Sequence, residues 1–290
     1  MKKLLTLATA AIASAVILAG CAAPAPAPAP APVAEPATEA DYDTDAETEA
    51  SPEYEAAAGS WAGRTIYMGT NAEFPPFEFI ADGGQGLHGQ YDGVDIAISV
   101  RIAEHLGAEL EIIDMPFEGL IMALAAGQVD FVAAALTVTE ERAQQVDFSI
   151  PYYSAFQTIL VAADNDAVTG ATSLYGMQVG VQIGTTGDFA ASAMDNVEVL
   201  RYSRAVDAIV PLINGQIDAI LVDSITAQFF YDAHAGNLRI VRDDEYFGHE
   251  QYAIAIGQGQ PELVAAINEV LQEMLDSGEI NALVAYYASN

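Results

Sequence analysis

The segment AAGQVDFVAA at residues 125–134 returns later in the chain as INGQIDAILV at residues 213–222. Both copies pass from the end of a helix through Gly-Gln, a β-branched residue and Asp into an apolar strand. A helix followed by a buried strand is the repeating unit of a mainly parallel sheet flanked by helices. The repeat therefore predicts an α/β fold built from two similar lobes of about 90 residues each.

Strands and helices alternate around both copies of this unit. Strands are predicted at 64–70, 109–115, 129–134, 178–182 and 197–202, and helices at 92–106, at 119–126 and after the turn at 184–187. In open α/β sheets, ligands bind beyond the carboxyl ends of the strands. The cleft between the two lobes is therefore the predicted ligand pocket.

The first 20 residues have the composition of an export signal. Lys2 and Lys3 form a positive start, residues 4–18 are an apolar run too short to span a membrane with margin, and Leu-Ala-Gly precedes Cys21. This pattern predicts a lipoprotein signal peptide at residues 1–20 and lipidation of the Cys21 thiol, which would anchor the chain to a membrane. An ordinary secretory leader with a coincidental cysteine is the alternative.

Residues 21–59 are predicted to be a linker. Ala and Pro alternate at residues 23–32, which favours extended polyproline II, and residues 33–59 hold nine acids and no cation. Low hydrophobicity and mutual repulsion of the acids predict a disordered spacer. A cation-binding tract is the alternative for the acidic part.

The composition excludes several classes of function. The chain has 9 Lys+Arg against 41 Asp+Glu, a formal charge of −32, so nucleic acid and anionic lipid surfaces are poor partners for its body. One cysteine forms no internal disulfide. The four histidines are scattered without ligand-like spacing, so we expect no metal site and no cofactor. A content of 52% hydrophobic residues is too high for a disordered chain.

Two motifs indicate anion binding. GTTG at residues 184–187 opens a predicted helix, whose first N–H groups favour an anion, but it lacks the Lys-Ser/Thr of a phosphate loop. TVTEERAQQVDFSIPYY at residues 137–153 places Arg142 in the first turn of a helix after a strand. An arginine binds a planar carboxylate through two parallel hydrogen bonds. A solvent-exposed helix residue is the alternative for Arg142, and no catalytic serine motif is present.

Five stretches together resemble one protein family. They are GTNAEFPPFEF (69–79), GVDIAISVRIAEHLG (93–107), MPFEGLIMALAAGQVDFVAAALTVTEERAQQVDFSIPYY (115–153), MQVGVQIGTTG (177–187) and INGQIDAILVDSITA (213–227). In this order they resemble the bacterial extracellular solute-binding proteins of family 3, which capture polar amino acids for ABC transporters. The resemblance extends over the whole body, from about residue 64 to residue 290.

The resemblance implies a bilobed periplasmic-binding-protein-like fold, with two α/β lobes joined by a two-strand hinge. Lobe 1 would comprise residues 60–152 plus 253–290, and lobe 2 residues 153–252. The chain would cross near residues 152–156 and 248–252, and the ligand would be enclosed by hinge closure.

The resemblance also implies roles for individual residues. Arg142 would bind the α-carboxylate of an amino acid, assisted by Thr137 and Thr186, and Asp223 would bind its α-ammonium group. Phe74 and Phe117 would enclose the ligand side chain; Phe74, beside Pro75-Pro76, is expected in a loop. The complete predicted site contains Asn71, Phe74, Phe117, Ala135, Thr137, Arg142, Gln182, Thr186 and Asp223.

The identity of the ligand depends on departures from the family pattern. Asn71 stands where members that bind basic side chains tend to carry an acid, and Gln182 is uncharged, although Glu73 and Glu78 lie nearby in the sequence. Ala135 replaces a frequent Gly or Ser, which keeps a backbone contact and removes a hydroxyl. A polar, uncharged amino acid such as glutamine is the predicted ligand.

The expected protein is a monomeric, lipid-anchored receptor of the cell envelope that delivers a free amino acid to an ABC permease in the cytoplasmic membrane. Two alternatives remain open: an enzyme similar to cyclohexadienyl dehydratase on the same scaffold, and an amino-acid sensor. The dehydratase would need a general acid in the cleft, and no carboxyl group beyond Asp223 is evident there.

Overall fold

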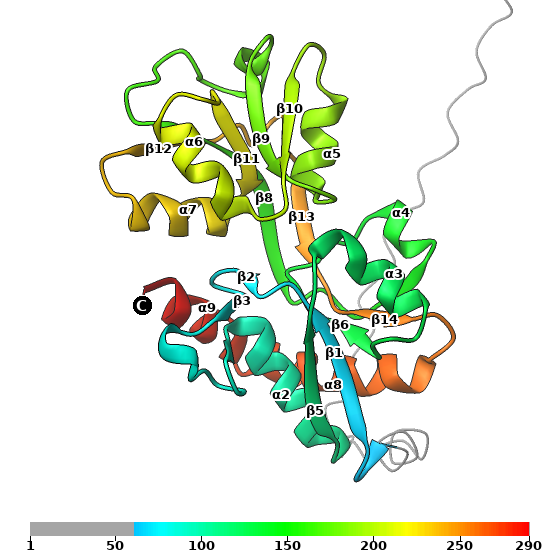
Figure 1. The fold of residues 1–290 in the computed structure, drawn as a ribbon. Helices are drawn as coiled ribbons and strands as arrows, with labels where there is room; N and C mark the ends of the chain where they lie inside the picture. Colours follow the sequence, from blue (N-terminus) through cyan, green and yellow to red (C-terminus); the bar gives the residue numbers. More distant parts are fainter. Residues whose placement is uncertain (1–60, 290) are drawn as a thin grey trace, which may run out of the picture. The chain divides into compact units, whose positions relative to one another are not determined.

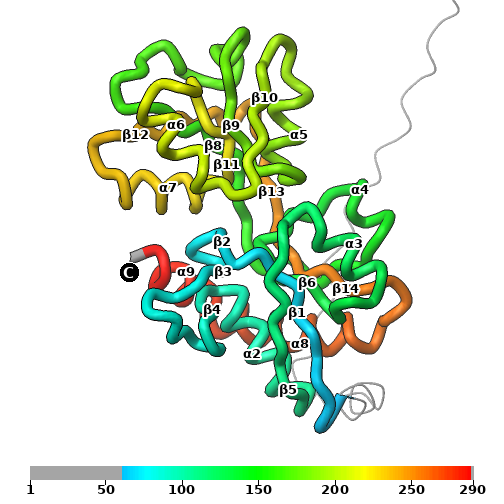
Figure 2. The backbone as a smooth tube through the Cα atoms, in the orientation of Figure 1, coloured from blue at the N-terminus to red at the C-terminus, as the bar shows by residue number. Residues whose placement is uncertain are grey.

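The computed structural model describes residues 61–289, and these residues all fall within one compact unit. The predicted signal peptide, Cys21 and the predicted linker at 21–59 lie outside the described residues. Two larger sheets and one small sheet organise the described chain, and Figure 2 traces its path through them.

The first sheet has the strand order β5-β1-β6-β14-β7. Its strands are β1 (Thr65–Thr70), β5 (Glu109–Asp114), β6 (Phe131–Val132), β7 (Val146–Phe148) and β14 (Ala255–Gly257). β1 pairs in parallel with β5 and β6, whereas β14 pairs antiparallel with β6 and β7. The predicted parallel core of the sheet is confirmed, and β14, from near the end of the chain, lies between β6 and the edge strand β7.

Helices pack around this sheet (Figure 1). They are α2 (Val94–Leu106), α3 (Leu120–Ala125), α4 (Glu140–Ala143), α8 (Pro261–Asp276) and α9 (Glu279–Ser289), with 3-10 turns η1 (Asp82–Gly84) and η2 (Phe117–Gly119). Gly107 ends α2 in the left-handed conformation (φ 65°), as predicted, because a residue without Cβ adopts it without strain. α8 buries one apolar stripe, which includes Leu263, Ile267 and Leu271.

The second large sheet has the order β10-β9-β11-β8-β12, and β13 pairs with β8 beside it. Its strands are β8 (Tyr153–Ala162), β9 (Gln178–Gln182), β10 (Glu198–Tyr202), β11 (Ala219–Asp223), β12 (Leu238–Val241) and β13 (His249–Tyr252). The helices are α5 (Thr186–Ala193), α6 (Ile209–Ile213) and α7 (Ser224–Ala233), with η3 (Ala171–Leu174) and η4 (Ala205–Ala208), and Figure 1 shows them around the sheet.

The sequence repeat corresponds to a structural repeat in the two sheets. Gly127 and Gly215 each have φ 67° at the end of α3 and α6. The repeated aspartate then accepts a backbone N–H of the neighbouring parallel strand, from Tyr67 to Asp130 and from Gln178 to Asp218, at 2.8 Å in both cases. The conserved spacing within the repeat therefore fixes the register between a strand and its neighbour.

Two adjacent strands connect the sheets. β8 and β13 pair antiparallel from Tyr153↔Tyr252 to Phe156↔His249, and Figure 1 shows them side by side. The paired segments, 153–156 and 249–252, coincide with the two predicted crossings, and β8 continues beyond its crossing to Ala162. The division into lobe 1 (60–152 plus 253–290) and lobe 2 (153–252) stays a prediction.

Some predicted elements differ from the structure. The strand expected at 129–134 is reduced to Phe131–Val132, because the backbone leaves the ladder and reaches Ala135 in the left-handed region (φ 44°). A small sheet of β2 (Glu73–Phe74), β3 (Glu78–Ile80) and β4 (Tyr91–Asp92) follows β1 and was not predicted. Phe74 therefore lies in a strand, so its expected place in a loop is wrong.

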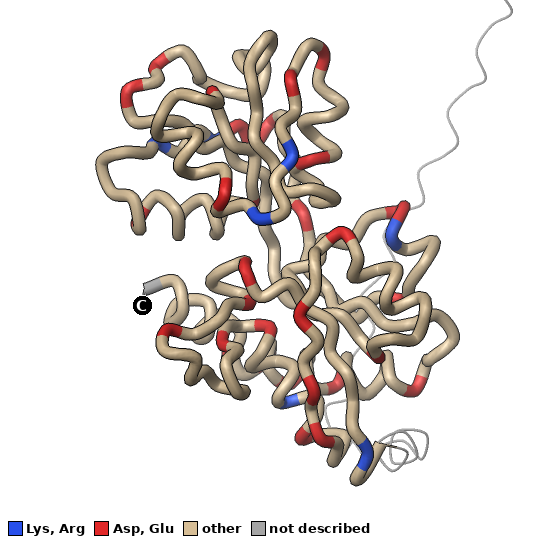
Figure 3. Tube along the Cα trace, viewed as in Figure 1, with Lys and Arg blue, Asp and Glu red and all other residues tan. Residues whose placement is uncertain are grey.

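The described residues carry acids over both sheets and few cations, as Figure 3 shows. All seven arginines of the chain fall within them, and the two lysines, Lys2 and Lys3, do not. Within residues 61–289, no helix combines the length and apolarity that a membrane span requires.

Candidate functional site

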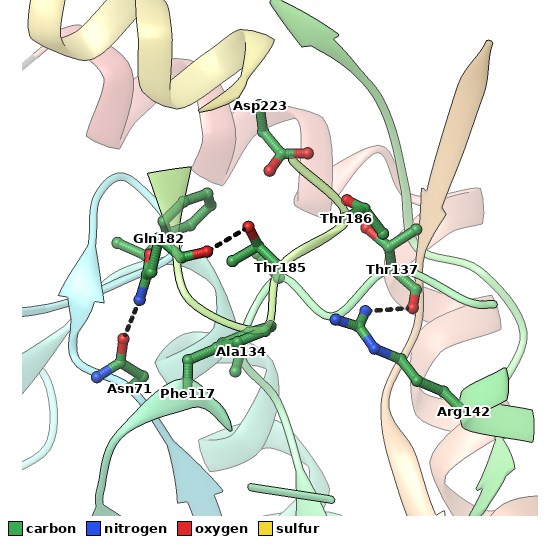
Figure 4. A pocket seen from close by; sticks show the side chains of 11 residues that line it. Asn71, Phe117, Ala134, Thr137, Arg142, Gln182, Thr185, Thr186 and Asp223 are labelled. Carbon is green, nitrogen blue, oxygen red and sulfur yellow. Dashed lines mark hydrogen bonds between the residues drawn. The ribbon is translucent and has the colours of Figure 1, made fainter. Parts of the chain in front are cut away.

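A pocket lies where the carboxyl ends of strands from both large sheets meet. All nine predicted site residues line it, together with two residues that the sequence reasoning missed, Ala134 and Thr185 (Figure 4). The lining residues are Asn71, Phe74, Phe117, Ala134, Ala135, Thr137, Arg142, Gln182, Thr185, Thr186 and Asp223.

Arg142 is buried, with 6% of its surface exposed. Thr139 caps α4 by accepting the Arg142 backbone N–H at 3.1 Å, which fixes where the side chain starts. Its guanidinium donates to the Thr137 carbonyl at 2.7 Å and to the Gly184 carbonyl at 3.2 Å, and it lies 5.5 Å from the Phe117 ring centroid. Among the described residues it forms no ion pair with an acid, so a buried cation faces the pocket without a matched anion.

The electrostatic environment of Arg142 reflects this burial. Desolvation lowers the pKa of Arg142 from its usual value, and the negative charges of Glu250 and Asp223 act in the opposite direction. A guanidinium stays protonated in proteins. The group is therefore a fixed positive charge at one side of the pocket.

Asp223 lies at the end of β11 and is 7% exposed. Its Oδ1 atom has no hydrogen-bond donor among the described residues. Burial first and the charge of Glu250 second raise the pKa of Asp223 to about 7, whereas the nearby Tyr252 hydroxyl, Gln157 amide and Arg142 oppose the shift. A cationic ligand group at Oδ1 would supply the missing donor and favour the ionised carboxylate.

Glu250 is a functional candidate that the sequence reasoning missed. It lies on the crossing strand β13, and one oxygen, Oε2, accepts hydrogen bonds from Thr186 Oγ1 (2.9 Å), Thr137 Oγ1 (3.1 Å) and Gln157 Nε2 (3.1 Å). It thereby joins Thr137, which follows the first sheet, to Thr186 at the start of α5. A charged residue inside the crossing predicted at 248–252 is the signal that would have identified it.

The two threonine hydroxyls are committed as donors to Glu250, so neither has a second proton for a ligand. The backbone N–H groups of Thr137 and Thr186 have no acceptor within the described part of the chain. Thr185 is the N-cap of α5, and its hydroxyl accepts the Asp188 N–H. GTTG thus opens a helix as predicted and directs a free N–H at the pocket.

Asn71 and Gln182 form the uncharged part of the wall. Gln182 Nε2 donates to Asn71 Oδ1 at 2.9 Å and to the Ser203 carbonyl at 3.3 Å, and Asn71 Nδ2 donates to the Met115 carbonyl at 3.1 Å (Figure 4). The two backbone carbonyls fix which way each amide points, because only the amide nitrogen donates. This contact links the end of β1 to the end of β9.

The remaining predicted positions supply apolar surface and backbone. Phe74 is 8% exposed and belongs to the main core cluster as well as to the pocket wall, whereas Phe117 opens η2 beside Arg142. Ala135 presents its strained backbone to the pocket. Neither Glu73 nor Glu78 lines the pocket: Glu73 pairs with Arg204 at 3.5 Å, and Glu78 is fully buried.

Comparison with known proteins relates this geometry to a family. The family model for bacterial extracellular solute-binding proteins, family 3, matches residues 66–290. A probable histidine-binding protein of Campylobacter jejuni is 30% identical over 224 residues, which cover 77% of this chain and 84% of the relative. The L-cystine-binding protein TcyJ of Escherichia coli is 28% identical over 221 residues, which cover 76% and 80%.

Solved structures agree with this match. The substrate-binding protein of an amino acid ABC transporter is 39% identical with a TM-score of 0.72, and the match covers 78% of this chain and 100% of that chain. An ancestral amino acid-binding protein, AncCDT-1, a precursor of cyclohexadienyl dehydratase, is 33% identical with a TM-score of 0.70 over 77% of this chain and 95% of that chain. The predicted bilobed α/β fold is thereby confirmed.

Proposed function

Because the chain belongs to the bacterial extracellular solute-binding proteins of family 3, whose members here are amino-acid-binding proteins, we propose that its pocket binds one free amino acid with a polar, uncharged side chain. The amino acid is held between the two sheets and handed to the permease of an ABC transporter. Glutamine is the first candidate.

The observation that carries the proposal is a pair of unmatched charges in one pocket. Arg142 is a buried cation without an acid partner among residues 61–289, and Asp223 is a buried acid with an unpartnered oxygen. Leaving either charge unpaired in the interior is costly. A zwitterion supplies both missing partners at once, a carboxylate for Arg142 and an ammonium group for Asp223.

Thr137 and Thr186 are proposed to contact the ligand through their backbone N–H groups and not through their hydroxyls. Their hydroxyls donate to Glu250, so we assign the carboxylate contacts to the backbone N–H groups of Thr137 and Thr186. Thr186 is the first residue of α5, where the helix dipole favours an anion. Together with Arg142, these groups surround the position proposed for the ligand carboxylate.

The uncharged amides argue for an uncharged ligand side chain. Asn71 and Gln182 supply hydrogen-bonding groups without net charge, and Phe74 and Phe117 supply apolar surface. A basic side chain would find no acid at Asn71. The relatives named for histidine and for cystine differ in ligand charge, so the preference rests on these residues of the chain itself.

We propose that the protein is not an enzyme. Asp223 is the one acid among the pocket-lining residues, and the ammonium group of the ligand occupies it. A dehydratase needs a further general acid in contact with its substrate. Glu78, an acid close to the pocket residue Phe74 in the sequence, is fully buried and does not line the pocket, so it cannot serve as that general acid.

We also propose that lipidation at Cys21 anchors a monomeric, extracytoplasmic receptor to a membrane of the cell envelope, and that the chain serves transport rather than sensing. If Cys21→Ser still pellets with washed membranes, the anchor is wrong. Uptake of the labelled ligand by cells that lack the permease would contradict the transport role.

A thermal-shift screen of the purified protein against the twenty amino acids tests the ligand. A ligand present at 100 times its Kd adds about 2.7 kcal/mol to the free energy of unfolding. We expect the largest shift with glutamine and none with Arg142→Ala. A larger shift with arginine, lysine or histidine refutes the proposed side-chain preference, and no shift with any amino acid refutes the function.

A further inference from the structure

Two acids lie together in the core behind the pocket wall. Glu78 belongs to β3 and Asp95 to the first turn of α2, and both are 0% exposed. Asp95 Oδ2 accepts the Ala135 backbone N–H at 2.7 Å and the Tyr152 hydroxyl at 2.9 Å. Asp95 therefore connects a residue of the pocket wall to the residue that precedes the crossing strand β8.

Three oxygens of this pair have no donor among the described residues. They are both carboxyl oxygens of Glu78 and Oδ1 of Asp95, and all are buried. A buried polar atom without a partner is costly, and such atoms are rare in native proteins. A hydrogen bond between the two carboxyl groups requires a proton, and two ionised carboxylates have none to donate.

The surroundings supply no cation to balance two ionised carboxylates. The charged groups that act on Glu78 are the acids Asp95, Asp114 on β5 and Asp223 on β11, and the titratable group facing Asp95 from the crossing is Tyr152. Burial is the largest influence on both acids. It raises the pKa of Glu78 well above its usual value and that of Asp95 only to about 6, because Ala135 and Tyr152 donate to Asp95.

We propose that Glu78 is a neutral carboxylic acid that donates its proton to Asp95 Oδ1, and that this acid–carboxylate pair is a positioning element of the binding site. One proton satisfies the empty acceptor on Asp95, removes one of two adjacent charges and leaves Asp95 ionised for its other two donors. Glu78 does not contact the ligand; it acts through Asp95.

The object that the pair positions is the backbone at Ala135. Ala135 has φ 44°, a conformation that residues other than glycine rarely adopt and that persists only when the surroundings determine it. The 2.7 Å hydrogen bond from its N–H to Asp95 is one such constraint. The pair thereby fixes the backbone at Ala135, which lies just before Thr137 and Arg142 in the chain.

This inference depends on the proposed function in one respect only, that the ligand in contact with the pocket wall is an amino acid. The proton itself is tested without a ligand, by infrared spectroscopy of the C=O stretch of a protonated carboxyl group. Subtracting the spectrum of Glu78→Gln from that of the wild type at pH 8 should leave one buried carboxylic-acid band. Glu111→Gln, a change at an exposed acid of β5, is the matched control and should leave none.

The positioning role is tested by comparing two replacements of Glu78. Glu78→Gln retains a donor to Asp95 without a titrating proton, and we expect amino-acid affinity within about threefold of the wild type. Glu78→Leu has no donor and should weaken binding at least about tenfold at pH 7. Hydrogen exchange at the Ala135 N–H, which needs no ligand, should be slow in the wild type and Glu78→Gln and faster in Glu78→Leu.

The outcomes separate the two proposals. An absent infrared band overturns the proton on Glu78, and equal exchange at Ala135 in all variants overturns the positioning role. If Glu78→Leu fails to fold, a loss of Ala135 protection or of affinity in Glu78→Gln overturns it instead. If no amino acid binds the wild type while band and exchange behave as expected, the proposed function fails and the acid–carboxylate pair stands.

Discussion

Asp223 should couple amino-acid binding to the release of a proton. Its pKa in the ligand-free protein is raised from 3.8 to about 7, mainly because the carboxyl group is buried. An ammonium group bound at Asp223 favours the ionised carboxylate. The free protein therefore holds a proton that the complex does not, and affinity should rise with pH.

The magnitude follows from the fraction of Asp223 that is ionised before binding. With a pKa of about 7, roughly half of the molecules are ionised at pH 7 and about one in eleven at pH 6. The affinity should thus fall about fivefold between pH 7 and pH 6 and approach tenfold per unit below that. The complex should release about half a proton at pH 7 and about 0.9 proton at pH 6.

Isothermal titration calorimetry in two buffers with different ionisation enthalpies counts these protons. The range from pH 6 to pH 8 is suitable because Asp95, with a pKa of about 6, adds its own effect at lower pH. Asp223→Asn is the control: it keeps all four histidines, so the difference between the two proteins isolates Asp223. Equal proton release by both proteins at pH 6 would refute the reasoning.

The same pKa shift affects stability without ligand, with the opposite sign. Between pH 4 and pH 7 the folded state holds the Asp223 proton and the unfolded chain has lost it, so the free energy of unfolding falls as pH rises, by at most about 1.4 kcal/mol per pH unit from this group. Thermal unfolding of the wild type and Asp223→Asn should show this difference in slope, and parallel slopes would contradict the raised pKa.

Three further substitutions test the remaining roles by calorimetric affinity. Arg142→Ala should cost about 2–5 kcal/mol of binding energy by leaving the ligand carboxylate unpaired, whereas Arg239→Ala, which also removes a guanidinium bonded to two backbone carbonyls, should leave affinity unchanged. Equal effects would show that only the fold is disturbed. Asn71→Asp should improve the affinity for arginine relative to glutamine by about tenfold or more, and an unchanged ratio would remove Asn71 from the specificity site. Glu250→Gln should shift the pH dependence of binding to lower pH, because it removes a charge that raises the pKa of Asp223; an unshifted midpoint would separate the two acids.

The site residues that the sequence could predict are those whose positions follow from the order of strands and helices along the chain. Arg142 was singled out because it lies in the first turn of a helix directly after a strand, whereas Asp223, which ends the strand of the repeated unit, was assigned by the family resemblance. Parallel strands carry their carboxyl ends to one edge, so such positions converge on the pocket without knowledge of the tertiary structure. That these residues bind an amino acid stays a prediction.

The parts that escaped prediction depend on contacts distant in sequence. Glu250 is a charged residue inside the predicted crossing, but its hydrogen-bond donors lie 64 and 113 positions earlier, and HEQYAIAI does not indicate which residues they are. Glu78 lies close to Asn71 in the sequence, but it pairs within the small sheet and is buried in the core. Phe74 was expected in a loop because of Pro75-Pro76, and the same unpredicted sheet places it in β2.

Because the chain has few cations and many acids, an arginine without an acid partner is unexpected. Arg101, Arg201 and Arg204 each pair with acids, as expected where acids are in large excess. Arg142 and Arg239 instead donate to backbone carbonyls, but only Arg142 lines the pocket. In a chain of charge −32, a buried arginine could have acquired an acid partner by a single substitution on any neighbouring strand. Under the proposed function, the ligand carboxylate supplies the anion that the buried guanidinium lacks, and this contact offsets the cost of desolvating Arg142.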